Sequence, residues 1–328
     1  LFSPGTVLSL MAIGNGTTVK EFILLGFTNH PELESLLLLV FLAFYLMMLL
    51  GNLGMITLIW TNPGLHTPMY FLLRQLAFLD VCFSTTVLPQ LLVTLVSGRA
   101  VVSYGQCATQ FFMFTFFGST DCYLLALMAY DRYVAVCQPL LYVTIMTPKR
   151  RLKLVTGAYL GGLANAILRT SCTFSLSFCG DNQIDFIFCD LPPLLELSCG
   201  DTFLQELLIL LFACFVILAS LVMILVSYLF IIRAILQIQS AGGRAKTFST
   251  CASHMTAVGL FFGTLAFMYV RNRSGKSLEE DKVVSVFYTV VIPMLNPLIY
   301  SLRNKEVKEA LKKTFSRNGW NLFRKTGN

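Results

Sequence analysis

The chain has 328 residues, of which 56% are apolar and only 12% are charged, and its formal net charge is +7. Its mean hydropathy is +0.72. Because soluble domains carry about 25% charged residues, this composition excludes a water-soluble globular protein and places most of the chain in lipid. Apolar runs recur so closely that no separate soluble domain fits between them.

Seven apolar stretches are long enough to cross a bilayer, whose hydrocarbon core of about 30 Å needs about 20 residues of helix. A backbone in lipid must satisfy its own hydrogen bonds, and the alternating pattern of barrel strands is absent, so these stretches should be helices. The sequence therefore predicts an all-α fold, a seven-transmembrane helix bundle. The predicted spans are 36–60, 69–96, 107–130, 154–178, 207–232, 252–270 and 283–302.

Lys and Arg residues are distributed unevenly between the two sides of this bundle. One side carries 17 of the 24 basic residues and three acidic residues, whereas the other carries seven basic and twelve acidic residues. Short basic loops stay in the cytoplasm, so we expect a multi-pass plasma-membrane protein with the N-terminus outside and the C-terminus inside. The chain then divides into an extracellular segment 1–35, a transmembrane domain 36–303, and a cytoplasmic amphipathic helix and tail 304–328.

Two glycosylation sequons agree with this orientation. Asn15 heads one in the extracellular segment, and Asn272 heads a second on the same side, close to the membrane. We expect Asn15 to carry the glycan because a lumenal enzyme could reach it. Ten residues precede Met11, and we expect the natural chain to start at that methionine.

Four cysteines fall on the predicted extracellular side, where disulfides persist. Cys107 heads the third span, while Cys179, Cys189 and Cys199 share the loop after the fourth. Four thiols can pair in three ways. We favour Cys107 with Cys189 and Cys179 with Cys199, which would fix the loop across the mouth of the bundle, although spacing alone leaves free thiols open.

Asp80 and Asp121 are the only carboxylates well inside the apolar runs, and charges at such depth usually mark function. Three interpretations are open. The two groups could be protonated and hydrogen-bonded by Ser84, Ser119 or Asn296, they could bind Na⁺, or they could be the acid/base pair of an intramembrane protease. The Gly-x-Gly-Asp pattern of such a protease is absent around both. The three histidines form no metal set.

Pro293 and Pro297 interrupt the seventh span. Each removes a helix hydrogen bond and predicts a kink, and Asn296 beside them offers an amide to the freed backbone groups. The kink is a simple bend in a static bundle and a hinge in a protein that changes shape.

Four motifs resemble those of one family. They are LHTPMYFL at 65–72, MAYDRYVAVC at 128–137, KTFSTCASH at 246–254 and PMLNPLIYSLRN at 293–304. They resemble, in the same order, motifs of the olfactory receptors, a family of rhodopsin-like G-protein-coupled receptors, and the resemblance extends over residues 21–313. The wording of the motifs favours the tetrapod-type branch.

The resemblance implies a receptor that an odorant activates and that drives the olfactory stimulatory G protein to raise cAMP. By position, the two favoured cysteine pairs match the disulfides of the family, and Asp80 and Asp121 match its intramembrane acidic pair. Two departures stand out: the family usually has Glu at the position of Asp121, and it commonly has Tyr where this chain has Phe262.

A conformational switch is expected near the cytoplasmic ends of the helices. A bidentate ion pair between Asp131 and Arg132 would hold the resting state, and the resemblance implies that Arg132, Tyr228 and His254 exchange partners on activation. Taken alone, His254 and Tyr228 could equally be solvated interface and membrane-anchor residues. The residues assigned to switching and G-protein coupling are Asp131, Arg132, Tyr133, Tyr228, His254, Asn296, Pro297 and Tyr300.

A ligand cavity should lie between the outer halves of the third, fifth, sixth and seventh spans, lined by apolar groups and a few polar ones. We expect about half of the candidates to touch ligand, because aromatic residues at helical spacing are often core packing. No Asp or Lys stands on the wall formed by the third span, so a small neutral volatile fits better than an amine. The candidates are Phe114, Thr115, Gly118, Ser119, Phe212, Phe262, Leu265, Tyr269 and Thr289.

After the seventh span, residues 304–315 predict a short amphipathic helix. Val307, Leu311 and Phe315 repeat every four residues, with lysines on the other side, so the helix should lie on anionic membrane lipids of the inner leaflet. The sidedness of the basic residues accounts for the net charge, so no nucleic-acid partner is expected.

Two further classes remain as alternatives. A transporter or channel ranks second, although no internal repeat is visible between the halves, and the intramembrane protease ranks third. The sequence thus predicts a receptor rather than an enzyme, with no cofactor other than a Na⁺ ion at Asp80 and Asp121.

Overall fold

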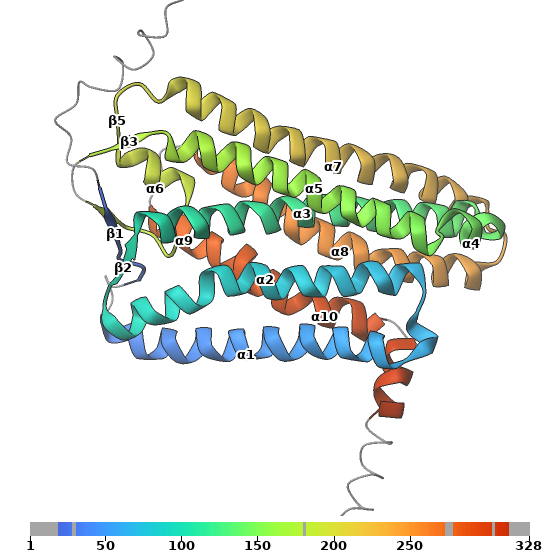
Figure 1. Cartoon of the computed structure of the whole chain (residues 1–328). Coiled ribbons are helices and arrows are strands. Elements are labelled where there is room, and N and C mark those ends of the chain that lie inside the picture. The colour runs from blue at the N-terminus through green and yellow to red at the C-terminus, as the bar shows by residue number, and fades with distance from the viewer. Residues whose placement is uncertain (1–18, 28–30, 180–181, 273–277, 304–305, 315–328) are drawn as a thin grey trace, which may run out of the picture.

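The computed structural model describes residues 19–27, 31–179, 182–272, 278–303 and 306–314. Seven long helical segments run side by side in one bundle within these ranges (Figure 1). The seventh segment is continuous through a π-helical turn. The segments are α1 (Pro31–Thr61), α2 (Pro68–Ser97), α3 (Tyr104–Cys137), α5 (Pro148–Phe174), α7 (Phe203–Gln237), α8 (Ala241–Asn272) and the series α9 (Leu278–Val286), η4 (Phe287–Val291) and α10 (Ile292–Arg303).

Six of the seven segments are long and apolar enough to span a membrane. The remaining segment, α5, has 27 residues and lies along the bundle but is less apolar than the other six. The all-α seven-helix prediction is confirmed. The predicted fourth span, 154–178, lies within α5 as far as Phe174, and only its last four residues fall outside the helix. Thr147 accepts a hydrogen bond from the amide of Arg150, and this N-cap together with Pro148 sets the start of α5.

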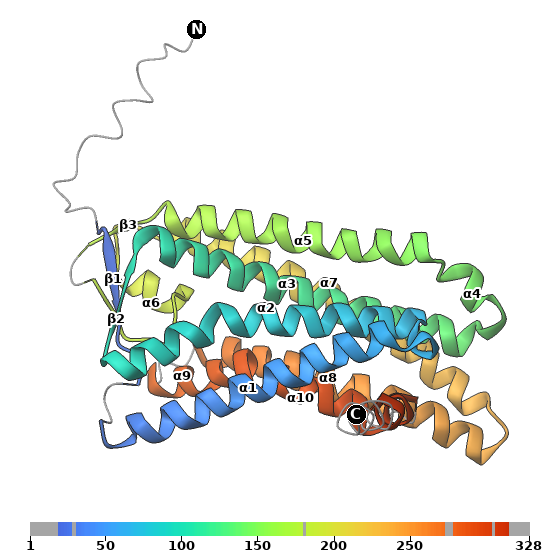
Figure 2. The ribbon, with the colours of Figure 1, turned by 60° about the horizontal axis from the view of Figure 1, so that its bottom comes forward.

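The helix α3 runs through the middle of the bundle and contacts α2, α5, α7 and α8 (Figure 2). Its start is fixed by a capping box, in which Ser103 accepts from the amide of Gln106 and the Gln106 side chain accepts from the amide of Ser103. Because α3 meets four other helices, its residues reach every internal site described below.

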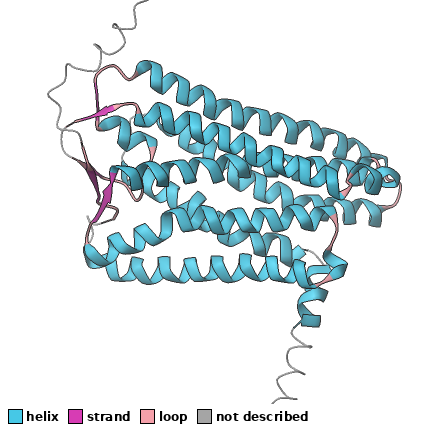
Figure 3. Cartoon of the chain, viewed as in Figure 1, coloured by secondary structure: helices cyan, strands magenta, loops and turns pink. Residues whose placement is uncertain are grey.

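Two small sheets lie at one end of the bundle, a feature that the sequence did not predict (Figure 3). β1 (Glu21–Leu24) pairs antiparallel with β2 (Ala100–Ser103) and parallel with β4 (Gln183–Ile184), and β3 (Ser177–Phe178) pairs with β5 (Ser198–Cys199). The short helix α6 (Leu191–Glu196) lies in the same loop region. These elements form a cap over that end of the bundle.

Both favoured disulfides are present in the cap. Cys107 is bonded to Cys189 and Cys179 to Cys199, with Cα atoms 5.5 Å and 6.0 Å apart. The loop between α5 and α7 also binds the last helical series, because the buried ammonium of Lys282 on α9 donates to Asp185 of this loop at 2.6 Å. The loop between α5 and α7 is therefore bound to both α3 and α9.

The two prolines of the last series leave carbonyls without helix donors, and side chains from neighbouring helices bond them. Ser84 on α2 donates to the carbonyl of Thr289 at 2.7 Å, and Asn52 on α1 donates to the carbonyl of Pro293 at 3.0 Å. Each carbonyl lies four residues before a proline, which has no N–H to donate. The expected donor, Asn296, was wrong, since its amide faces Asp80 instead.

A further helix covers residues 306–314 at the end of the bundle opposite the cap. Val307 is buried and Leu311 packs against the same core, while Tyr70 on α2 donates to Glu306 at 2.7 Å. The predicted apolar stripe thus contacts the bundle through Val307 and Leu311. Phe315, its third member, lies outside the described residues, as does the sequon residue Asn15.

Candidate functional site

The bundle encloses a cavity of about 80 Å³, here called the central cavity. One wall is aromatic: the rings of Phe83 and Phe114 stack at 5.1 Å, and Phe114 also packs against Phe188 of the cap at 4.7 Å. Phe188 itself does not line the cavity, so the loop between α5 and α7 contacts this wall from behind. The lining residues are Phe83, Phe114, Thr115, Gly118, Ser119, Cys122, Asn165, Arg169, Ala213, Val216, Ile217, Phe261, Leu265 and Tyr288.

Five of the nine candidate ligand residues line the central cavity: Phe114, Thr115, Gly118, Ser119 and Leu265. A Cβ added at Gly118 would lie 3.5 Å from the ring of Phe83, which is an ordinary van der Waals contact, so Phe83 packs directly over this position of α3. The side chain of Tyr269 lies outside the part of the chain that is described.

The other three candidates do not line the cavity. Phe262 is buried in the core and packs edge-to-face on Phe261. Phe261, rather than Phe262, lines the cavity. Thr289 is fully buried and donates to the carbonyl of Ser285 at 2.7 Å. Phe212 is half-buried, and its neighbour Ala213 faces the cavity instead.

Two polar residues of α5 belong to the cavity wall and were missed. Asn165 donates to Ser119 at 2.7 Å, and Arg169 follows it by four residues on the same helix face. The signal was present, because Arg169 is a charged residue inside a predicted span.

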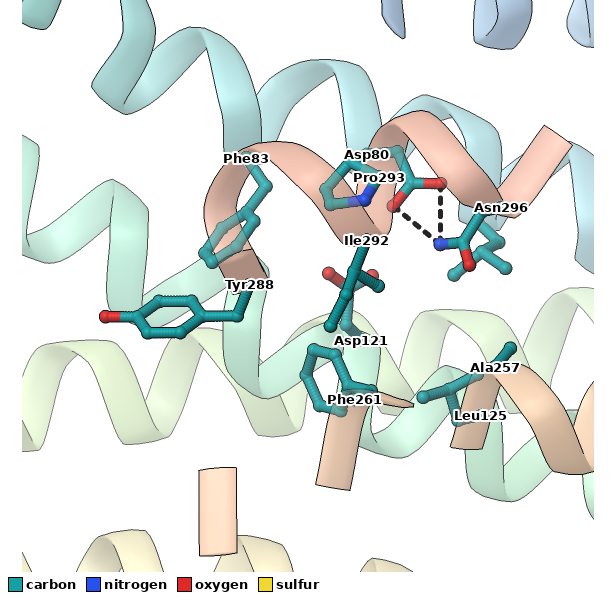
Figure 4. Close-up of a pocket in the computed structure, with 11 residues that line it drawn as sticks. Asp80, Phe83, Asp121, Leu125, Ala257, Phe261, Tyr288, Ile292, Pro293 and Asn296 are labelled. Atoms are coloured by element: carbon teal, nitrogen blue, oxygen red, sulfur yellow. Dashed lines mark hydrogen bonds between the residues drawn. The ribbon is translucent and has the colours of Figure 1, made fainter. Parts of the chain in front are cut away.

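Asp80 and Asp121 line a second, much smaller cavity of about 10 Å³, which we call the acidic cavity. Figure 4 shows them approaching it from different helices, α2 and α3. Asn296 on α10 donates to both oxygens of Asp80 at 3.0 Å. Ser84 and Ser119 bond to other groups, so Asn296 alone of the three expected partners contacts this carboxylate pair.

Unpaired oxygens face the acidic cavity. Among the described residues, one carboxylate oxygen of Asp121 and the side-chain oxygen of Asn296 are buried without a hydrogen-bond partner. Oxygen donors of this kind suit a hard cation. The residues present therefore fit Na⁺, in spite of the shorter side chain at position 121.

A hydrogen-bonded cluster joins α3, α7 and α8 nearer the other end of the bundle. Tyr228 on α7 bonds to Nδ1 of His254 on α8 at 2.8 Å, and Nε2 of His254 lies 3.1 Å from the carbonyl of Leu125 on α3. The carbonyl accepts, so Nε2 carries the proton and Tyr228 donates to Nδ1. We call these three residues the histidine clamp. His254 is fully buried, so it is not a solvated interface residue.

The expected ion pair between Asp131 and Arg132 is not formed in this conformation of the described chain. Asp131 is buried and accepts from the hydroxyl of Tyr142 at 2.9 Å. Burial, the charge of Asp131 and this hydrogen bond raise the pKa of Tyr142, so the phenol keeps its proton. The partner of Asp131 in this structure is thus a tyrosine of α4 (Tyr142–Ile145), and Arg132 is half-buried.

The remaining switch candidates lie around the histidine clamp and the last helix. Tyr133 packs against Phe230 of α7, with ring centroids 5.7 Å apart. Tyr300 is buried, and its hydroxyl has no partner within the described residues. Pro297 lies against Gly51 of α1, where an added Cβ would approach its ring at 3.3 Å.

Seven long helices packed around a central cavity, six of them apolar enough to span a membrane, are the architecture of a multi-pass membrane protein. The chain belongs to the olfactory receptor family, since the family model described as "Olfactory receptor" matches residues 41–318. It is 64% identical over 307 residues to olfactory receptor 9Q1 of Homo sapiens (94% of this chain, 99% of the relative). It is 53% identical over 299 residues to olfactory receptor 5AP2 of Mus musculus (91% and 94%).

Family membership confirms the resemblance drawn from the four motifs. The protein is an odorant-sensing G-protein-coupled receptor and not an enzyme, which removes the intramembrane protease from the alternatives. Olfactory receptor 9I1 of Homo sapiens, 62% identical over 307 residues, covers 94% of this chain and 98% of its own length.

Proposed function

We propose that a small volatile odorant binds in the central cavity and shifts the helices so that the receptor activates the olfactory stimulatory G protein and raises cAMP. The observation that carries this proposal is the path of α3. The same helix supplies Thr115 to the central cavity, Asp121 to the acidic cavity and the carbonyl of Leu125 to the histidine clamp. Leu125 follows Thr115 by ten positions, which at 1.5 Å per residue is about 15 Å along the helix.

The histidine clamp is the element whose equilibrium the ligand would bias. It ties α8 to α3 and α7 through two hydrogen bonds of a fully buried imidazole. A ligand shifts a conformational equilibrium only by its difference in affinity between the two states. Leu265 and Phe261 bring α8 to the cavity wall, so movement of α8 would change ligand contacts and the clamp together.

The receptor would work in the plasma membrane with the cap outside the cell and residues 306–314 on the cytoplasmic side. The excess of basic residues on the side that includes residues 306–314 supports this orientation. Lysines of that helix would face anionic lipid headgroups. The G protein would bind at the same end, near Arg132.

We also propose that the acidic cavity binds Na⁺ in the resting state. The two carboxylates and Asn296 supply the oxygens. A bound cation would supply positive charge between two acids that otherwise repel each other. Asp121 and Asn296 would hold it through the oxygens that have no other partner among the described residues.

The test is odorant-dependent cAMP production in cells that express the receptor with its G protein. We expect at least one volatile of a chemically diverse panel to raise cAMP, and Arg132→Ala to abolish the response at equal surface expression. Arg99→Ala, an exposed residue at the cap end, is the matched control and should respond normally. Solute transport by the purified protein without G protein would contradict the proposal.

A further inference from the structure

Arg169 is a cation in the wall of a largely apolar cavity. Its guanidinium carbon lies 5.9 Å from the ring centre of Phe111, and its Nε is buried without a hydrogen-bond partner. No hydrogen bond or ion pair reaches Arg169 from the part of the chain that the structure describes. A guanidinium is always charged, and Arg169 is half-buried with an unpaired Nε. The cavity thus offers a cation that holds no ion pair or hydrogen bond within the described residues.

One acid, Asp190, interacts electrostatically with Arg169, but it is a weak counter-ion. Asp190 at the start of α6 is buried and accepts the amide hydrogen of Leu191 at 2.7 Å, and it forms no ion pair with Arg169 within 4 Å. Burial raises the pKa of Asp190, and the charge of Asp281 raises it further, against the lowering effects of the Leu191 amide and Arg169. An anion placed in the cavity would therefore be the stronger partner of the guanidinium.

Two hydroxyl groups of α3 point to the same ligand chemistry. Thr115 is 3% exposed and lines the cavity, and its hydroxyl has no partner within the described chain. Ser119, one turn later, accepts a hydrogen bond from Asn165, which leaves its own O–H free to donate. Hydroxyl and guanidinium donors in one cavity suit a carboxylate, which accepts about four hydrogen bonds and pairs with arginine in a bidentate manner.

We infer that Arg169 determines ligand specificity and that the preferred odorants are small carboxylic acids with a branched or aromatic apolar body. The carboxylate would face Arg169, Thr115 and Ser119, and the apolar body would pack against the aromatic wall of Phe83 and Phe114. This inference rests on the proposed odorant cavity and replaces the expectation of a neutral ligand. It keeps the exclusion of amines, because no carboxylate is among the described lining residues.

The experiment compares matched ligands on the wild-type receptor and on variants. Phenylacetic acid, methyl phenylacetate and 2-phenylethanol form one series, and 3-methylbutanoic acid, its methyl ester and 3-methylbutan-1-ol form the other. On the wild type, we expect each acid to act at a concentration at least tenfold lower than its ester and alcohol. Arg169→Gln should abolish this advantage, and Arg169→Lys should restore part of it, because lysine keeps the charge but loses the bidentate fork. Arg99→Gln removes the same charge at the exposed cap end and should leave the advantage intact.

Two readouts separate this inference from the proposed signalling. Stabilisation of the purified receptor against heat measures binding, and cAMP measures coupling. Acids that stabilise the receptor without raising cAMP support the inference and contradict the coupling. Neutral members that act at lower concentrations than the acids overturn the inference, as does the absence of any response to either series. If Arg169→Gln fails to reach the cell surface, the wild-type comparison and Thr115→Val, which should weaken acid binding about threefold, still decide.

Discussion

The histidine clamp should restrain the receptor in its resting state, and Tyr228→Phe tests this directly. The substitution removes one hydroxyl and keeps the ring that stacks on His254 at 5.8 Å. The lost hydrogen bond spans 2.8 Å between groups that are 7% and 0% exposed. A bond of this kind contributes about 0.5–1.5 kcal/mol, which corresponds to a roughly twofold to tenfold change in an equilibrium constant.

We therefore expect basal cAMP in Tyr228→Phe cells to rise roughly twofold to tenfold without odorant. Tyr159→Phe is the matched control, because it removes a hydroxyl that bonds to Gln75 between α5 and α2, away from the clamp. Basal cAMP is measured at equal surface expression, by staining an extracellular tag. Unchanged or lower basal cAMP in Tyr228→Phe would refute the reasoning that the clamp opens on activation.

Three further predictions concern packing, the cation and the last helix. Gly162→Ala should lower the free energy of unfolding by about 1–3 kcal/mol, because the new Cβ would lie 2.1 Å from the hydroxyl oxygen of Thr120 on α3. Gly157→Ala is the control and should not lower it, because its Cβ would meet no atom within 4 Å. Thermal melting of the purified receptor measures both variants. Na⁺ should raise the melting temperature relative to K⁺, and Asp121→Asn should remove that difference. Asn52→Ala should lower the free energy of unfolding by about 1–3 kcal/mol, because it leaves the carbonyl of Pro293 without a hydrogen bond. Asn62→Ala, at the half-buried position just after α1, should lower it less in the same melting assay.

The helices of the bundle were predictable because the signal for each is local. Hydrophobic length and the need to satisfy backbone groups in lipid act on one segment at a time. The predicted end at 178 was wrong for α5, which is less apolar than the other six segments and ends at Phe174. The strands of the cap were not predictable, because β1 finds its partners in two loops far along the chain.

The lining of the central cavity was predictable only where one helix face stood out. On α3, Thr115, Gly118 and Ser119 follow helical spacing and line the cavity as expected. On α8, Phe261 and Phe262 are equally apolar and both match Leu265 in spacing, so the sequence could not fix which one faces inward. A rotation of one residue, about 100°, separates the two choices.

The sequence by itself determined the family, the number of helices and the positions at which ionisable groups enter the apolar spans. Those properties depend on residue order and on the energetics of single segments in lipid. The tertiary structure decided which partner each polar group takes: Asn52 rather than Asn296 for a freed carbonyl, and Tyr142 rather than Arg132 for Asp131. The physical reason is that each of these bonds joins groups from different helices or loops, and its free energy depends on which faces the packed bundle brings together.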